Sequence, residues 1–134
     1  MGHMPRDYFR PYPYEKAKEE IARVLNKRFS NKNLEEREDG SKQRWITDIP
    51  INPDDRDKII DFVRSLNPNY SYTDDWYPVY GFTKKSEMKI EKRGEKYVKK
   101  IIEYNRELEF FNGFVAVKDV VKRYEIKSGD DNDE

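Results

Sequence analysis

Apolar residues are scarce in this chain, and that scarcity limits the core it can build. Hydrophobic residues are 35% of the 134 residues, charged residues are 40%, and the mean hydropathy is -1.16. A globular domain usually has a larger apolar share. The aromatic share of 14% compensates, because each buried ring removes a large area from water. The length predicts a single domain with a small core of aromatic and β-branched residues.

Proline, charge and the first residues divide the chain into four parts. Residues 1–4 read as a remnant of cloning ahead of the authentic start. Residues 5–13 contain three prolines and three aromatic rings, which predicts an extended aromatic arm. Residues 14–127 are expected to form one α+β domain, and the acidic tail 128–134 is expected to be disordered.

The chain has no cysteine, and its one histidine, His3, lies in the cloning remnant. Cysteine and histidine are the side chains most often used as nucleophile, neutral-pH base or transition-metal ligand. We therefore expect no catalytic residues, no metal site and no cofactor. No apolar run approaches the ~20 residues that span a bilayer, so we expect no membrane association. With no disulfides to indicate secretion, an intracellular protein of the cytoplasm or nucleus is expected.

Charge is balanced over the whole chain but not along it. The formal net charge is zero and the pI is about 6.6, whereas a dedicated nucleic-acid binder is usually basic. Residues 34–75 contain eleven acidic and six basic residues, and residues 76–106 contain nine basic and four acidic residues. Such blocks are either ordinary solvated faces or a one-signed binding surface on a neutral protein.

Periodicity predicts the elements of the first half. Apolar residues at helical spacing indicate a helix over Tyr14–Phe29. Residues 31–38 either extend this helix or form one arm of a hairpin that turns at Asp39-Gly40. Residues 43–51 predict a strand. Asn52 is a good N-cap for a second helix that reaches Leu66, with Pro53 as its first residue.

In the second half, Tyr70–Thr83 predicts two strands joined by a turn, and residues 84–93 alternate as on an exposed strand. Spacing predicts a helix over Glu95–Leu108. Asn112-Gly113 is either a hairpin turn or a helix C-cap, and in both cases we favour a strand that begins at Phe114. After the first helix, the order strand, helix, strand, strand, helix, strand predicts a ferredoxin-like, split βαβ antiparallel sheet backed by helices.

Residues 44–50 (RWITDIP) and 80–82 (YGF) resemble the RNA recognition motif. Residues 44–50 (RWITDIP) place Trp45, Ile46, Ile49 and Pro50 where the first-strand motif has an aromatic, two aliphatic residues and a proline. Tyr80-Gly81-Phe82 resembles the centre of the third-strand motif. The third-strand motif normally opens with a basic residue and glycine, where this chain has Pro78-Val79.

The resemblance implies a non-enzymatic module that binds single-stranded nucleic acid, RNA favoured. Rings on such a sheet stack on unpaired bases while flanking cations hold phosphates. The stacking residues would be Trp45, Tyr80 and Phe82, and the cations would be Arg44, Lys84 and Lys85. The structural alternative is that Trp45 and Phe82 are core residues and Tyr80 is half-exposed on a sheet.

Two other functions remain open. The rings of Tyr8, Phe9 and Tyr12 could dock on another chain, which would make this a protein-interaction or assembly domain; the sequence leaves the oligomeric state undetermined. The second alternative is a Mg²⁺-dependent nuclease, because Asp54, or Asp74 and Asp75, followed by Glu87-Met88-Lys89 resembles the spaced Asp and Glu-x-Lys of such enzymes.

Overall fold

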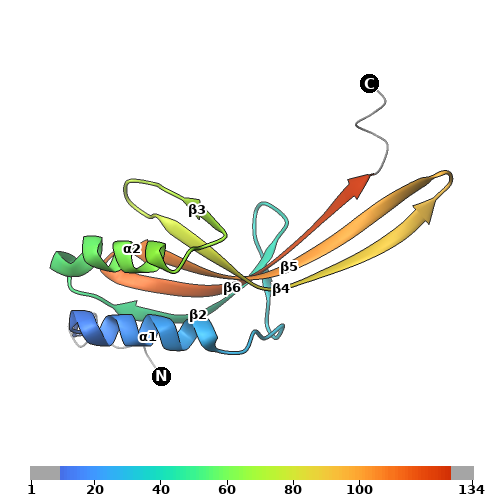
Figure 1. Ribbon diagram of the computed structural model, residues 1–134. Coiled ribbons are helices and arrows are strands. Elements are labelled where there is room, and N and C mark those ends of the chain that lie inside the picture. Colours follow the sequence, from blue (N-terminus) through green and yellow to red (C-terminus); the bar gives the residue numbers. More distant parts are fainter. Residues whose placement is uncertain (1–9, 128–134) are drawn as a thin grey trace.

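The computed structural model describes residues 10–127, which form one antiparallel sheet and two helices (Figure 1). In chain order the elements are α1 (Tyr14–Asn26), β1 (Glu35–Glu36), β2 (Lys42–Pro50), η2 (Pro53–Asp55), α2 (Arg56–Ser65), β3 (Tyr70–Tyr72), β4 (Val79–Arg93), β5 (Lys96–Phe111) and β6 (Phe114–Lys127). The sheet order is β1-β2-β6-β5-β4-β3, and each neighbouring pair is antiparallel. The predicted α+β class is confirmed.

Both helices form where the apolar spacing and capping residues predict them. Helix α1 buries Ala17, Ile21 and Val24 but ends at Asn26 rather than Phe29. Helix α2 follows a 3-10 turn, η2. The side-chain oxygen of Asn52 caps this turn by accepting a hydrogen bond from the Asp54 N–H at 3.0 Å. The predicted helix start at Asn52-Pro53 is therefore confirmed.

The structure contains hairpins at both places where the sequence left a hairpin as one of two alternatives, and positive φ angles explain their turn residues. Asn112 (φ 49°) and Gly113 (φ 81°) form a two-residue turn between the paired residues Phe111 and Phe114. The β1–β2 turn uses Gly40 at φ 88°, but Arg37 pairs with Ser41, so its loop has one residue more than the expected Asp39-Gly40 turn. Strands β3 and β4 pair as the two strands expected within Tyr70–Thr83.

The predicted helix over Glu95–Leu108 is wrong, because this segment is β5, the central strand between β4 and β6. Its apolar residues happen to fit a helical period because the outer half of the strand has apolar side chains on both faces. Gly94 (φ 63°) turns β4 back into β5, so both sides of β5 have a hydrogen-bonding neighbour. Tertiary strand pairing overrides the local pattern here.

The ferredoxin-like order is consequently not confirmed. The split βαβ arrangement needs a second helix between its third and fourth strands, and this chain has β5 there. Strands β4, β5 and β6 instead follow one another as a meander, with hairpin turns at Gly94 and Asn112-Gly113.

The core lies between the helices and one face of the inner half of the sheet (Figure 1). Alternation along the strands directs Leu108 and Phe110 of β5, and Val115 and Val117 of β6, toward the helices. We call this side of the sheet the helix side. Tyr80 and Ile49 complete the same cluster from β4 and β2.

Beyond the helices, β4, β5 and β6 continue outward as a three-stranded projection (Figure 1). We call this projection the β arm: residues 85–103 of β4 and β5 and residues 122–127 of β6. Ten basic and five acidic residues lie in it. The core cluster contains none of its residues, so the arm is an appendage of the helix-covered half.

Candidate nucleic-acid interface

One face of the β arm, continuous with the helix side, is charged. Its side chains alternate in sign and form ion pairs: Lys85 with Glu87 at 2.9 Å, and Lys100 with Glu91 at 3.3 Å. Arg93 contacts both Glu91 at 3.0 Å and Glu125 of β6 at 3.4 Å. We call this the charged face.

At the outer end of the charged face, a pocket of about 230 Å³ is lined by Arg93, Lys96, Val98 and Lys127. Val98 is buried, so it forms an apolar floor, and the other three lining residues are cations from three different strands. We call this the tip pocket. Since no carboxylate of residues 10–127 lines it, the pocket is suited to an anionic group such as a phosphate.

The opposite face of the arm is apolar. Cross-strand pairing places Met88, Ile101 and Tyr124 in one row, and Ile90, Lys99 and Ile126 in the next. The exposed fractions are 59% for Met88, 56% for Ile90, 42% for Tyr124 and 49% for Ile126. We call Met88, Ile90, Ile101, Tyr124 and Ile126 the apolar face.

The three rings predicted to stack on bases are not brought together. Tyr80 is 3% exposed and packs edge-on against Phe110, with ring centroids 6.1 Å apart. Phe82 packs against the same core and is half-buried. Trp45 is 48% exposed, but its register with Lys118 places it on the other side of the sheet, where Lys118 Nζ lies 5.0 Å from the ring centroid. A single platform of these rings therefore does not exist.

The three cations predicted beside those rings are not brought together either. Lys85 is exposed on the charged face and pairs with Glu87. Lys84 lies at a bulge in β4 and donates to the Leu25 carbonyl at the end of α1, and burial, followed by the nearby Arg106 charge, lowers its pKa. Arg44 is half-buried on the helix side, 3.7 Å from Asp119.

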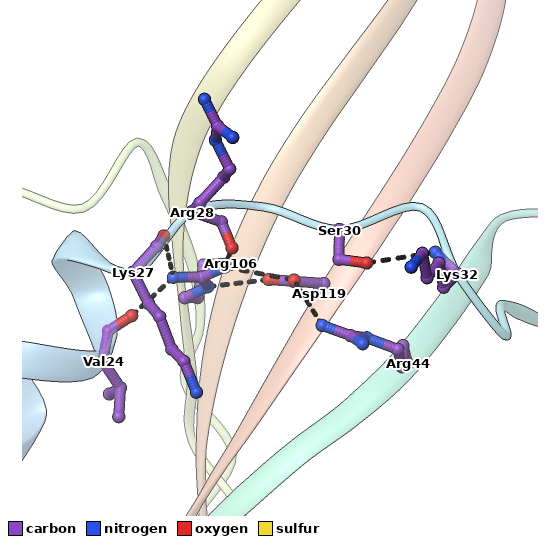
Figure 2. Close-up of polar contacts among 8 residues, drawn as sticks. All are labelled: Val24, Lys27, Arg28, Ser30, Lys32, Arg44, Arg106 and Asp119. Atoms are coloured by element: carbon purple, nitrogen blue, oxygen red, sulfur yellow. Dashed lines mark hydrogen bonds and ion pairs between the residues drawn. The ribbon is translucent and has the colours of Figure 1, made fainter.

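Arg106 and Asp119, which sequence reasoning missed, form the most buried polar group of the helix side (Figure 2). Both are 0% exposed, and Arg106 donates to the two Asp119 oxygens at 2.7 and 3.1 Å. Its guanidinium also donates to the carbonyls of Val24 and Lys27 at the end of α1, where the Val24 carbonyl accepts in addition from the Lys27 N–H at 3.3 Å. A cation at a helix C-terminus is favourable, so this group is a structural anchor for α1.

A second polar group lies on the other side of the sheet, around Glu107. The Tyr70 hydroxyl donates to Glu107 at 2.5 Å, and Arg37 reaches the same carboxylate at 3.4 Å. Tyr70 crosses directly over Gly81, where an added Cβ would lie 2.1 Å from the ring. Burial, and secondarily the Glu107 charge, raises the pKa of Tyr70. These contacts join β3 and the β1–β2 hairpin to the central strand.

Of the predicted aromatic arm, residues 5–13, only residues 10–13 lie in the described part of the chain. Tyr12 is half-buried, its N–H donates to the Pro50 carbonyl at 3.0 Å, and its ring packs on the core. Tyr8 and Phe9 lie outside the described residues, as does the tail from Ser128.

The carboxylates of the nuclease alternative occupy separate elements. Asp74 caps its own loop by accepting from the N–H groups of Trp76 and Tyr77, which lowers its pKa. Glu87 lies on the β arm beside Lys85 and Tyr104. Across residues 10–127, no three His, Asp or Glu side chains are grouped so as to hold a metal ion.

No helix within residues 10–127 is long and apolar enough to cross a membrane. Comparison with known proteins found no matching protein-family model, no matching curated protein and no matching solved structure.

Proposed function

We propose that this protein is a non-enzymatic module that binds single-stranded nucleic acid, RNA favoured, through the charged face of its β arm. The observation that carries the proposal is the tip pocket, where Arg93, Lys96 and Lys127 surround a space that no carboxylate of residues 10–127 lines. Phosphate oxygens are the natural ligands of such a cation group.

The charge of the whole arm supports the same ligand. Its twofold excess of basic over acidic residues makes it positive although the chain is neutral. A nucleic-acid strand following the charged face from the tip pocket would pass Lys100 and Lys89, which are cross-strand neighbours. Tyr104, half-buried at the inner end of the same face, packs edge-on against Phe29 and has Lys85 Nζ 5.6 Å from its ring centroid, so base stacking is not assigned to it.

The proposal departs from the RNA-recognition-motif geometry in where it places the ligand. The rings of Tyr80 and Phe82 serve the core, so they are not assigned to binding. Trp45 remains exposed and is the one predicted stacking residue that a ligand can reach from the other side of the sheet. The two placements are distinguishable because Trp45 and the tip pocket can be changed separately.

The test is fluorescence anisotropy of a labelled single-stranded RNA at several salt concentrations. Lys96→Gln/Lys127→Gln is expected to weaken binding and to reduce the salt slope by about 0.7 for each phosphate that the variant no longer neutralises. The control Lys16→Gln/Lys32→Gln also removes two positive charges, but from exposed positions outside the β arm. It should bind RNA with the same affinity as the unmodified chain.

Three outcomes would count against the proposal. Equal weakening in the two double variants would mean that net charge alone is responsible. A loss in Trp45→Ala, with Lys96→Gln/Lys127→Gln unaffected, would move the ligand to the opposite side of the sheet. Absence of salt-dependent binding by the unmodified chain would reject nucleic acid as the ligand.

A further inference from the structure

The apolar face is the largest group of exposed apolar side chains on one surface of the arm. Five large side chains from three strands lie there in two adjacent rows, with Lys99 between Ile90 and Ile126 in the outer row, and four of the five are at least 42% exposed. Monomeric proteins rarely leave such a contiguous patch open to water, and a patch of this kind marks an interaction site.

Charge is arranged asymmetrically at the two ends of this face. At the outer end, Lys92 and Lys99 lie on the same face as the apolar rows. At the inner end stands the β1–β2 hairpin, whose Asp39 lines a pocket of about 340 Å³ together with Lys122 and Tyr124. The acidic residues of that hairpin are Glu35, Glu36, Glu38 and Asp39.

We propose that the apolar face binds the apolar face of a second copy of this chain, with the two arms antiparallel across a two-fold axis. A two-fold interface must be self-complementary, because the same patch contributes both sides. This patch meets that requirement: the apolar rows meet in the middle, and each basic end lies over the acidic hairpin of the other copy.

Two further properties favour a second copy over an unrelated partner. The formal net charge of zero means that two copies approach without long-range repulsion. Face-to-face packing of two sheets is an established geometry for apolar strand faces. The charged face remains outside such a dimer, so this inference stands independently of the nucleic-acid proposal.

Sedimentation velocity of the full chain over a range of concentrations measures the outcome. The expected result is a concentration-dependent species of twice the 16.2 kDa chain mass. Ile90→Thr/Ile126→Thr keeps β-branched residues but removes apolar surface from the interface, and it is expected to raise the dimer dissociation constant by about tenfold or more. Ile102→Thr, the same change on the charged face, is the matched control and should leave the dimer intact.

Exchanging charged residues tests the antiparallel arrangement of the two β arms. These substitutions lie outside the hydrophobic core cluster, so they should not unfold the protein. Lys92→Glu/Lys99→Glu should weaken the dimer, and adding Glu35→Lys/Glu38→Lys should restore it, because the register places Glu35 on the same side of the sheet as the apolar face. A single species of 16.2 kDa at every concentration would overturn the proposal and leave the face to another protein or a lipid surface. A dimer unaffected by Ile90→Thr/Ile126→Thr would also overturn it, because its interface would lie elsewhere.

Discussion

At the scale of single residues, Arg106 and Asp119 bear directly on the stability of the helix-covered half. They pair across β5 and β6 with no exposure, and Arg106 also satisfies carbonyls at the end of α1. Without Arg106, the buried Asp119 carboxylate keeps only the 3.7 Å contact with Arg44, and breaking a buried pair costs about 3–5 kcal/mol. We predict that Arg106→Met lowers the free energy of unfolding by this amount, as measured by urea denaturation.

The double variant Arg106→Met/Asp119→Leu is the control for the pair. Because it removes the buried carboxylate together with its main partner, it should lose less stability than Arg106→Met alone. A double variant as unstable as Arg106→Met would mean that the contacts of Arg106 with the end of α1, which both variants lose, dominate its contribution rather than charge pairing.

Tyr70 gives the stability of the protein a dependence on pH in the alkaline range. Burial and the neighbouring Glu107 raise its pKa above the ordinary value of 10.0, so the folded chain retains a proton that the unfolded chain releases. The stability due to Tyr70 is therefore fully present below pH 10 and falls as the pH rises above 10 toward the raised pKa.

We predict that Tyr70→Phe is less stable at neutral pH by about 1.5–3 kcal/mol, because it loses a hydrogen bond to a carboxylate. Its stability should decline less steeply than that of the unmodified chain above pH 10. Urea denaturation at neutral and alkaline pH measures both effects, and Tyr97→Phe, at an exposed ring, is the control. Identical slopes in Tyr70→Phe and the unmodified chain would contradict this assignment.

At the scale of elements, local signals predicted the helices and turns well. The Asn52 cap, the Asn112-Gly113 turn and the apolar stripe of α1 each act through neighbours a few residues away, so the sequence contains the whole cause. Strand β5 is different, because its conformation depends on pairing with β4 and β6 at long range. Its inner half alternates from Arg106 to Phe110, and that alternation was the available signal.

The candidate site was less predictable for the same reason. Trp45 was predicted beside Tyr80 and Phe82 from a resemblance of motifs, but the register of β2 and β6 places it on the other side of the sheet. The tip pocket takes its cations from three strands, and the two faces of the arm follow from strand register. No single segment of sequence contains that information, although the basic block over residues 76–106 indicated where the charge would lie.

At the scale of the whole molecule, the protein divides into a helix-covered half that holds the core and a β arm that carries the tip pocket and the apolar face. Our proposal assigns stability to the first half and binding to the second. Since the core cluster contains no residue of the arm, shortening the arm should leave the core intact.

The most direct measurement is therefore RNA binding by a chain with a shortened arm. Residues 88–101 are replaced by Asn-Gly, which joins the paired residues Glu87 and Ile102 by a two-residue turn. Near-UV circular dichroism should show an intact core, and fluorescence anisotropy should show affinity for single-stranded RNA reduced by about tenfold or more. Undiminished, salt-dependent affinity in the folded, shortened chain would contradict the assignment of binding to the β arm.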